Sequence, residues 1–185
     1  MYRLIQPGYD ECCSADEFEN GINTIKHENF KVLMDICFNS ASYFSLSIAP
    51  WYFCKNVELA KELEPFLVKK IRVQKWFCYD FSSTDQFLEI NIYKAMGSTQ
   101  NILQKYFFDI FLREQKNGRM VNSTQTLENL CIFTETSLLL GTVTHEYMCH
   151  VYPPNETVGQ EIVLTGRWKY SADIPSEQIN VEQII

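Results

Sequence analysis

The sequence lacks several features that would place it in a well-defined functional class. Its seven glycines occur singly, so it has no glycine-rich loop of the kind that binds phosphate. No stretch approaches the ~20 consecutive apolar residues that a membrane-spanning helix needs. Residues 1–8 lack the apolar segment of a secretory signal peptide. We therefore expect a cytoplasmic protein that neither enters a membrane nor carries a phosphate-binding loop.

Cysteine pairs at metal-binding or redox spacing are also missing. The chain has seven cysteines, an odd number, so at least one cannot join an intramolecular disulfide, and no two follow the C-x-x-C pattern. Most lie in apolar runs, as Cys37 and Cys131 do, where free cysteine behaves as a small hydrophobic residue. We expect all seven to be reduced, which again favours the cytoplasm.

Positive charge is scarce. Sixteen Lys and Arg residues against 23 Asp and Glu residues give a net charge of −7. This balance disfavours contact with nucleic-acid phosphates and suits a basic protein partner. Alternatively, the charge serves only to keep the protein soluble. Asp16 and Glu17 are acidic candidates for partner binding, although Glu17 also fits a helix-capping box with Ser14.

Aromatic residues, by contrast, are abundant: they make up 14% of the chain, with thirteen Phe and ten Tyr. Two groups combine tryptophan with tyrosine, one around Trp51 and Tyr52 and the other around Trp168 and Tyr170. Such residues belong either to the core or to a recognition surface, because Trp and Tyr dominate binding hot spots. We therefore treat these four as candidate partner-binding residues.

The spacing of apolar residues predicts helical segments at residues 14–25, 30–38, 56–71 and 98–111. Residues 30–38 could instead form a buried central strand. Pro65 should bend or restart the third helix. Ser98 or Thr99 should cap the last helix, and Gly118 should end it.

Apolar–polar alternation and β-branched runs predict the strands. They are residues 44–48, half-buried; 76–81 and 88–94, joined as a hairpin; and 130–134, 138–149 and 161–170, with a loop at 153–156. The order predicts an α+β fold, an antiparallel sheet with N-terminal and inserted helices packed on it. A length of 185 residues fits one globular domain over 1–185, in which 171–185 form a docked or loose tail.

Residues 145–150, His-Glu-Tyr-Met-Cys-His, superficially match a zinc-protease motif. That motif needs histidines at positions i and i+4, whereas His145 and His150 are five residues apart. On a helix this offset separates them by about 140°, and on a strand they point to opposite faces. We therefore expect no metal or other cofactor, and a structural role for both histidines.

Cysteine–histidine catalysis remains open as an alternative. It needs a thiolate, a nearby histidine and an orienting group, and the chain has the residue types. Cys54 has the most suggestive context, because it follows Trp51 and Tyr52 shortly before a predicted helix. A small cysteine/histidine-dependent hydrolase is thus one alternative function, and a structural subunit of a larger assembly is another.

Residues 130–136 (LCIFTET) and 138–146 (LLLGTVTHE) resemble a hairpin of small bacterial immunity proteins, which neutralise polymorphic or contact-dependent toxins. The resemblance rests on an apolar strand, a turn and a Thr-His-Glu sequence. It implies a non-enzymatic protein that binds a toxin domain and blocks its active site or substrate path, without shared catalytic residues. An acidic face would steer it toward a basic toxin, and aromatic anchors would hold the complex.

Overall fold

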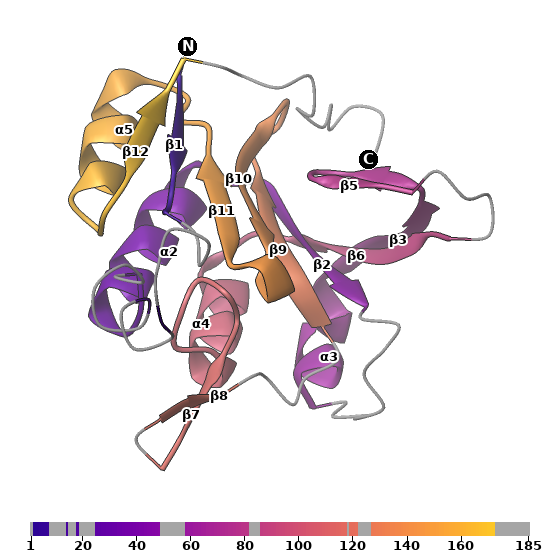
Figure 1. The fold of residues 1–185 in the computed structure, drawn as a ribbon. Coiled ribbons are helices and arrows are strands. Elements are labelled where there is room, and N and C mark those ends of the chain that lie inside the picture. The colour runs from indigo at the N-terminus through magenta and orange to yellow at the C-terminus, as the bar shows by residue number, and fades with distance from the viewer. Residues whose placement is uncertain are drawn as a thin grey trace.

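The computed structural model describes residues 2–7, 14, 18, 25–48, 58–81, 86–117, 119–121 and 127–172. Its main sheet is built from β1 (Arg3–Ile5), β2 (Tyr43–Ile48), β3 (Leu67–Val73), β6 (Leu88–Lys94), β9 (Leu127–Phe133), β10 (Leu138–Val143), β11 (Met148–Val151) and β12 (Lys169–Ser171). These eight strands are antiparallel and lie in the order β12-β1-β11-β10-β9-β2-β6-β3 (Figure 1).

The described residues contain four α-helices, α2 (Glu28–Ser40), α3 (Glu58–Leu63), α4 (Gly97–Tyr106) and α5 (Glu156–Val163). Together with the sheet they form the predicted α+β fold. The helices pack on one face of the sheet (Figure 1). There Leu33 of α2, Leu103 of α4 and Ile162 of α5 share a buried cluster with Phe44 and Ile132 of the sheet. No helix in these described segments is long and apolar enough to span a membrane.

The opposite face of the sheet is covered by a short hairpin of residues 74–81, in which β4 (Lys75–Trp76) pairs with β5 (Tyr79–Asp80). Trp76 packs edge-on against Phe133 at a ring-centre distance of 5.9 Å, and Phe77 packs against His150 at 5.6 Å. Gly141 makes this close approach possible, because a Cβ atom there would lie 2.8 Å from the Phe77 ring. We call this element the 74–81 hairpin.

The structure shows the outcome of two predictions for the first third of the chain, those for residues 30–38 and 44–48. Residues 30–38 lie in a helix, α2, whose buried positions Phe30, Leu33, Met34 and Cys37 follow the helical i, i+3, i+4, i+7 spacing. Residues 44–48 lie in strand β2 as predicted, but the strand is not half-buried. Its alternate residues Ser45 and Ser47 are 0% and 1% exposed, because both faces of the sheet are covered.

The predicted helix over 56–71 is wrong beyond Pro65. Helix α3 ends at Leu63, Pro65 lies in a short 3₁₀ turn, η3 (Glu64–Phe66), and residues 67–73 form strand β3. Proline cannot donate the helical hydrogen bond. The β-branched residues that follow, such as Ile71 and Val73, favour a strand once β6 is available for pairing.

The predicted hairpin of 76–81 with 88–94 is also wrong. Strand β5 pairs with β4, within the 74–81 hairpin, whereas β6 pairs with β3 on one side and β2 on the other. The strand partners were therefore misassigned, because sequence proximity and a turn-like linker do not determine which edge a strand pairs with.

Helix α4 is shorter than predicted. It ends at Tyr106, so Ile110 and Phe111 lie beyond it, where they are buried. The Asp109 carboxylate accepts backbone hydrogen bonds from Phe111 and Arg113, which stabilises a turn in place of further helix. Thr99 does help to cap α4, but from its third position: its hydroxyl accepts the N–H of the N-cap residue, Met96, at 3.1 Å.

The last third is less uniformly β-structured than predicted. Residues 156–163 form helix α5, and of the predicted 161–170 strand only residues 169 and 170 pair in the sheet, as part of β12. The predicted loop ends in an N-cap, because the Asn155 side chain accepts the Val158 N–H at 3.0 Å. The strand predicted over 138–149 is divided by a 3₁₀ turn, η4 (Thr144–Glu146).

A second small hairpin pairs β7 (Glu114–Lys116) with β8 (Arg119–Val121). Several sequence predictions lie outside the described residues. These are most of the predicted helix 14–25, the terminator Gly118, the candidate site residues Asp16, Glu17, Trp51 and Tyr52, the candidate nucleophile Cys54, and residues 173–185 of the tail.

Candidate functional site

A polar network lies where strand β9 bulges against β2. Ser45 is paired with Cys131 and Ser47 with Glu128, so two residues of β9 oppose one residue of β2. Asn129, inside this bulge, has a φ of 55°, in the left-handed region that Asn tolerates better than most residues. A β-bulge redirects side chains locally and is frequent next to functional sites.

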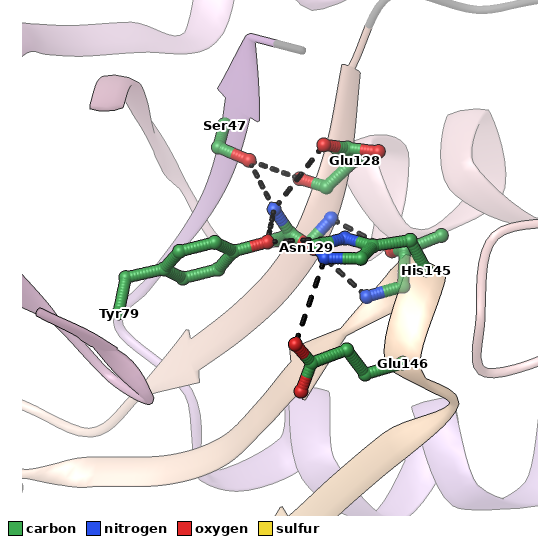
Figure 2. A network of polar contacts seen from close by, with 7 residues as sticks. Ser47, Tyr79, Glu128, Asn129, His145 and Glu146 are labelled. Carbon is green, nitrogen blue, oxygen red and sulfur yellow. Dashed lines mark hydrogen bonds and ion pairs between the residues drawn. The ribbon is translucent and has the colours of Figure 1, made fainter. Parts of the chain in front are cut away.

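Asn129 holds three elements together (Figure 2). Its backbone N–H donates to the Thr144 hydroxyl at 2.9 Å, and its side-chain oxygen accepts the Thr144 N–H at 2.8 Å, which fixes η4 to β9. Its side-chain nitrogen donates to the Ser47 hydroxyl on β2 at 2.7 Å and to the Tyr79 hydroxyl on the 74–81 hairpin at 3.1 Å.

The Glu128 carboxyl group is buried in this network, and few hydrogen bonds from the described residues replace those it would make with water. Its residue is 5% exposed. Among the described residues its side chain has one partner, the Asn129 side-chain nitrogen at 3.5 Å, whose two hydrogens already have the closer acceptors Ser47 and Tyr79. Burial raises the pKa of Glu128 from 4.5 to about 7, and the Asn129 contact offsets part of that rise. Glu128 can therefore gain or lose a proton near neutral pH.

Glu146, His145 and Tyr79 follow one another in an order that could in principle activate a hydroxyl nucleophile (Figure 2). The His145 Nε2 atom lies 3.7 Å from the Glu146 carboxylate, and its Nδ1 atom lies 3.3 Å from the Tyr79 hydroxyl. However, burial and the nearby Glu128 raise the pKa of Tyr79 well above its ordinary value of 10.0. The environment thus opposes formation of a tyrosinate.

The two histidines of the metal-like motif occupy different surroundings. His145 lies on η4 beside Tyr79, whereas His150 lies in β11 under Phe77. Burial, together with Arg3, lowers the pKa of His150 to about 4, so this side chain is neutral at physiological pH. Within the described segments no three His, Cys, Asp or Glu residues are placed to share a metal ion.

Three of the described cysteines are poor nucleophiles. Cys37, Cys131 and Cys149 are buried and not in disulfides, and Cys78 is a partly buried thiol that is also not in a disulfide. Burial raises the pKa of Cys37 and of Cys131 to about 12 and that of Cys149 well above its ordinary value. Because the thiolate is the reactive form, these three sites oppose cysteine catalysis.

The second candidate site is a surface where α5 leads into β12. Leu164 is 86% exposed and Tyr170 is 64% exposed, the largest values among the exposed large hydrophobic residues of the described chain. Trp168, which lies between them in the sequence, is half-buried against the core and donates from its indole N–H to Thr165 at 3.3 Å. Tyr2 of the neighbouring β1 segment packs against Tyr170 with ring centres 5.4 Å apart. We call Tyr2, Leu164, Trp168 and Tyr170 the α5–β12 surface.

A pocket of about 610 Å³ adjoins this surface through Tyr2. It lies between the β9–β10 turn and the start of α5, and hydroxyl and amide groups contribute to its lining, among them Thr134, Ser137, Tyr152 and Asn155. It could receive a polar side chain of a partner that contacts the α5–β12 surface.

Of the sequence-predicted candidates, Trp168 is partly buried and packs against the core, whereas Tyr170 is 64% exposed. Sequence reasoning missed Glu128 and Asn129, although two adjacent polar residues inside the apolar run 127–133 are a signal of a special position. It also missed Leu164, which was assigned to a strand. Comparisons with protein-family models, with curated proteins and with solved structures found no match for this chain.

Proposed function

We propose that this protein is a non-enzymatic binding protein of the immunity type, which neutralises a cognate toxin domain by covering its active site or substrate path. The observation that carries the proposal is the high exposure of Leu164, at the end of α5, and of Tyr170, in β12. Side chains of this kind are costly to leave in water and are typical anchors of protein interfaces. Three further properties of this surface and of the chain support the same function.

First, the α5–β12 surface combines rigid aromatic rings with one aliphatic side chain. Tyr170 packs on Tyr2, and the Trp168 indole is held by Thr165. A ring that is already held in place loses little conformational entropy on binding. Second, the adjoining pocket would give a partner side chain a polar recess beside the apolar anchors. Third, the net charge of −7 suits a basic toxin domain, which it would attract over a distance.

The proposal is tested by co-expression of the protein with a toxin domain encoded next to its gene. The wild type should restore growth, and Leu164→Asp combined with Tyr170→Ala should weaken protection and raise the Kd at least 30-fold, on the order of 2 kcal/mol for lost anchors. Val32→Asp is the matched control, because Val32 is also an exposed aliphatic residue, at 41%, but lies on α2. Full protection by the double variant, or none by the wild type, would refute the proposal.

A further inference from the structure

The 74–81 hairpin is attached to the rest of the molecule mainly by ring packing. Within the described residues its two strands pair only with each other, and Phe81 donates its N–H to Gln74 inside the same hairpin. Trp76 and Phe77 are each 4% exposed and pack on the sheet. Tyr79 adds polar contacts, through its hydroxyl, to Asn129 and His145.

That hydroxyl belongs to the same network as the buried Glu128 carboxyl group. The groups contributed by the surrounding elements are Ser47 from β2, Tyr79 from the hairpin, and His145 and Glu146 from η4. No cation among the described residues forms an ion pair with Glu128. The one lysine or arginine of the hairpin, Lys75, is paired with Asp80 at 2.7 Å. Among the described residues, a Glu128 carboxylate therefore has one long hydrogen bond and no counter-charge to stabilise it in a buried site.

We propose that Glu128 and Tyr79 form a proton-operated latch. The hairpin lies closed on the sheet while the Glu128 carboxyl group is neutral, and its Tyr79 end opens when the carboxylate forms, because opening admits the water that the carboxylate needs. This regulation goes beyond the binding function proposed above and concerns the other face of the sheet. Opening would expose apolar residues that the hairpin covers, among them Cys131 and Phe133.

The pKa of Glu128 sets the size of the effect. It is about 7 in the closed structure and ordinarily 4.5. If the open form has the ordinary value, linkage raises the ratio of open to closed molecules by up to about 300-fold between pH 4 and pH 9. The burial of Trp76 and Phe77 favours the closed form throughout, so the open form is a minor population that grows with pH.

The test measures alkylation of individual cysteines in the native protein by iodoacetamide, followed by site-resolved mass spectrometry. Cys131 is fully buried beneath the hairpin and contacts Trp76, whereas Cys37 and Cys149 are buried on the helix side and report global unfolding. In the wild type at pH 9, Cys131 should react faster than Cys37 and Cys149. Glu128→Gln should slow Cys131 by tens of fold or more at pH 9 but by only about fourfold at pH 5, where most of the effect of ionisation is absent.

Comparison at the same pH cancels the intrinsic pH dependence of thiol alkylation. Equal rates at all three cysteines in the wild type at pH 9 would overturn the latch, as would a Cys131 rate at pH 9 that is the same in wild type and Glu128→Gln. A second variant, Tyr79→Phe, removes the hydroxyl and keeps the ring, which packs 5.8 Å from Phe81. It should speed Cys131 alkylation at pH 5, and an unchanged rate there would also count against the proposal.

Discussion

Among the residues that the structure describes, two carboxyl groups are almost fully buried, and their surroundings are opposite in kind. Asp109, 0% exposed, contacts the Arg113 guanidinium at 2.6 and 2.5 Å and accepts two backbone N–H groups. Removing one partner of such a pair is strongly destabilising, so Asp109 has a structural role. Glu128 has one long hydrogen bond and no counter-ion among the described residues. Its burial therefore opposes stability whenever it is ionised.

The pH dependence of folding follows from this contrast. A carboxyl group whose pKa is raised on folding, here from 4.5 to about 7, binds its proton more tightly in the folded state. Its contribution to the free energy of unfolding is fully present below pH 4.5 and decreases as the pH rises to 7. Above pH 7 the free energy of unfolding is lower by about 3 kcal/mol, and this decrease no longer changes with pH. Glu128→Gln should therefore be more stable than the wild type at pH 8.5 by up to that amount, with the difference shrinking toward pH 4.5, as measured by urea unfolding.

Glu89→Gln serves as the control for that measurement. Glu89 lies on β6, its side chain is 51% exposed and it pairs with Arg72 at 3.8 Å, so its replacement should change stability little between the two pH values. A stability difference between Glu128→Gln and wild type that is the same at pH 4.5 and 8.5 would show that Glu128 does not titrate near neutrality.

The residues of this network could be predicted from the sequence only in part. The polar pair Glu128-Asn129 interrupts an apolar strand, which indicates a special position. Its partners, however, come from far along the chain: Ser47 is 81 residues from Glu128, and Tyr79 is 50 residues from Asn129. The raised pKa of Glu128 depends on burial by those distant segments, and no local pattern encodes it.

At the scale of elements, sequence patterns predicted helices and strands best where interactions between neighbouring residues determine them. The four-residue spacing of Lys31 and Asp35 favoured a helix at α2, although a central strand was left open, and the alternation in β2 identified that strand. Pairing was predicted poorly, because β6 takes its place between β2 and β3 through long-range contacts rather than pairing with the hairpin before it. Helix α5 was missed because Ile162 and Val163 favour a strand, whereas the Asn155 cap and the packing of Ile162 favour the helix.

Docking of the 74–81 hairpin depends on a close approach at Gly141. Gly141→Ala would place a Cβ atom 2.8 Å from the Phe77 ring, so we expect a loss of about 1–3 kcal/mol in the free energy of unfolding. In a Phe77→Ala background the ring is absent and the same change should cost much less. A double-mutant cycle by chemical denaturation measures the difference. If Gly141→Ala lowered the free energy of unfolding equally in both backgrounds, the Phe77 ring would not lie on Gly141.

At the scale of the whole molecule, the protein has a net charge of −7 and exposes large apolar side chains that are proposed to contact a partner. The charge should act before contact, so association with a basic toxin domain should slow about tenfold or more between 50 and 500 mM salt. Loss of Leu164 and Tyr170 should act after contact and mainly speed dissociation. Surface-binding kinetics at several salt concentrations separate the two effects. An association rate that is indifferent to salt would leave the charge as a means of solubility alone.

The most direct test of the proposed function is a hydrogen-exchange footprint of the protein with and without a toxin domain that it is proposed to neutralise. The account predicts that protection on binding is concentrated in residues 156–171 and in the adjacent β1 segment, which together carry the α5–β12 surface. The backbone around Leu164 and Tyr170 should be protected most strongly, because these side chains are the exposed anchors. Unchanged exchange across residues 156–171 in a saturated complex would contradict the account.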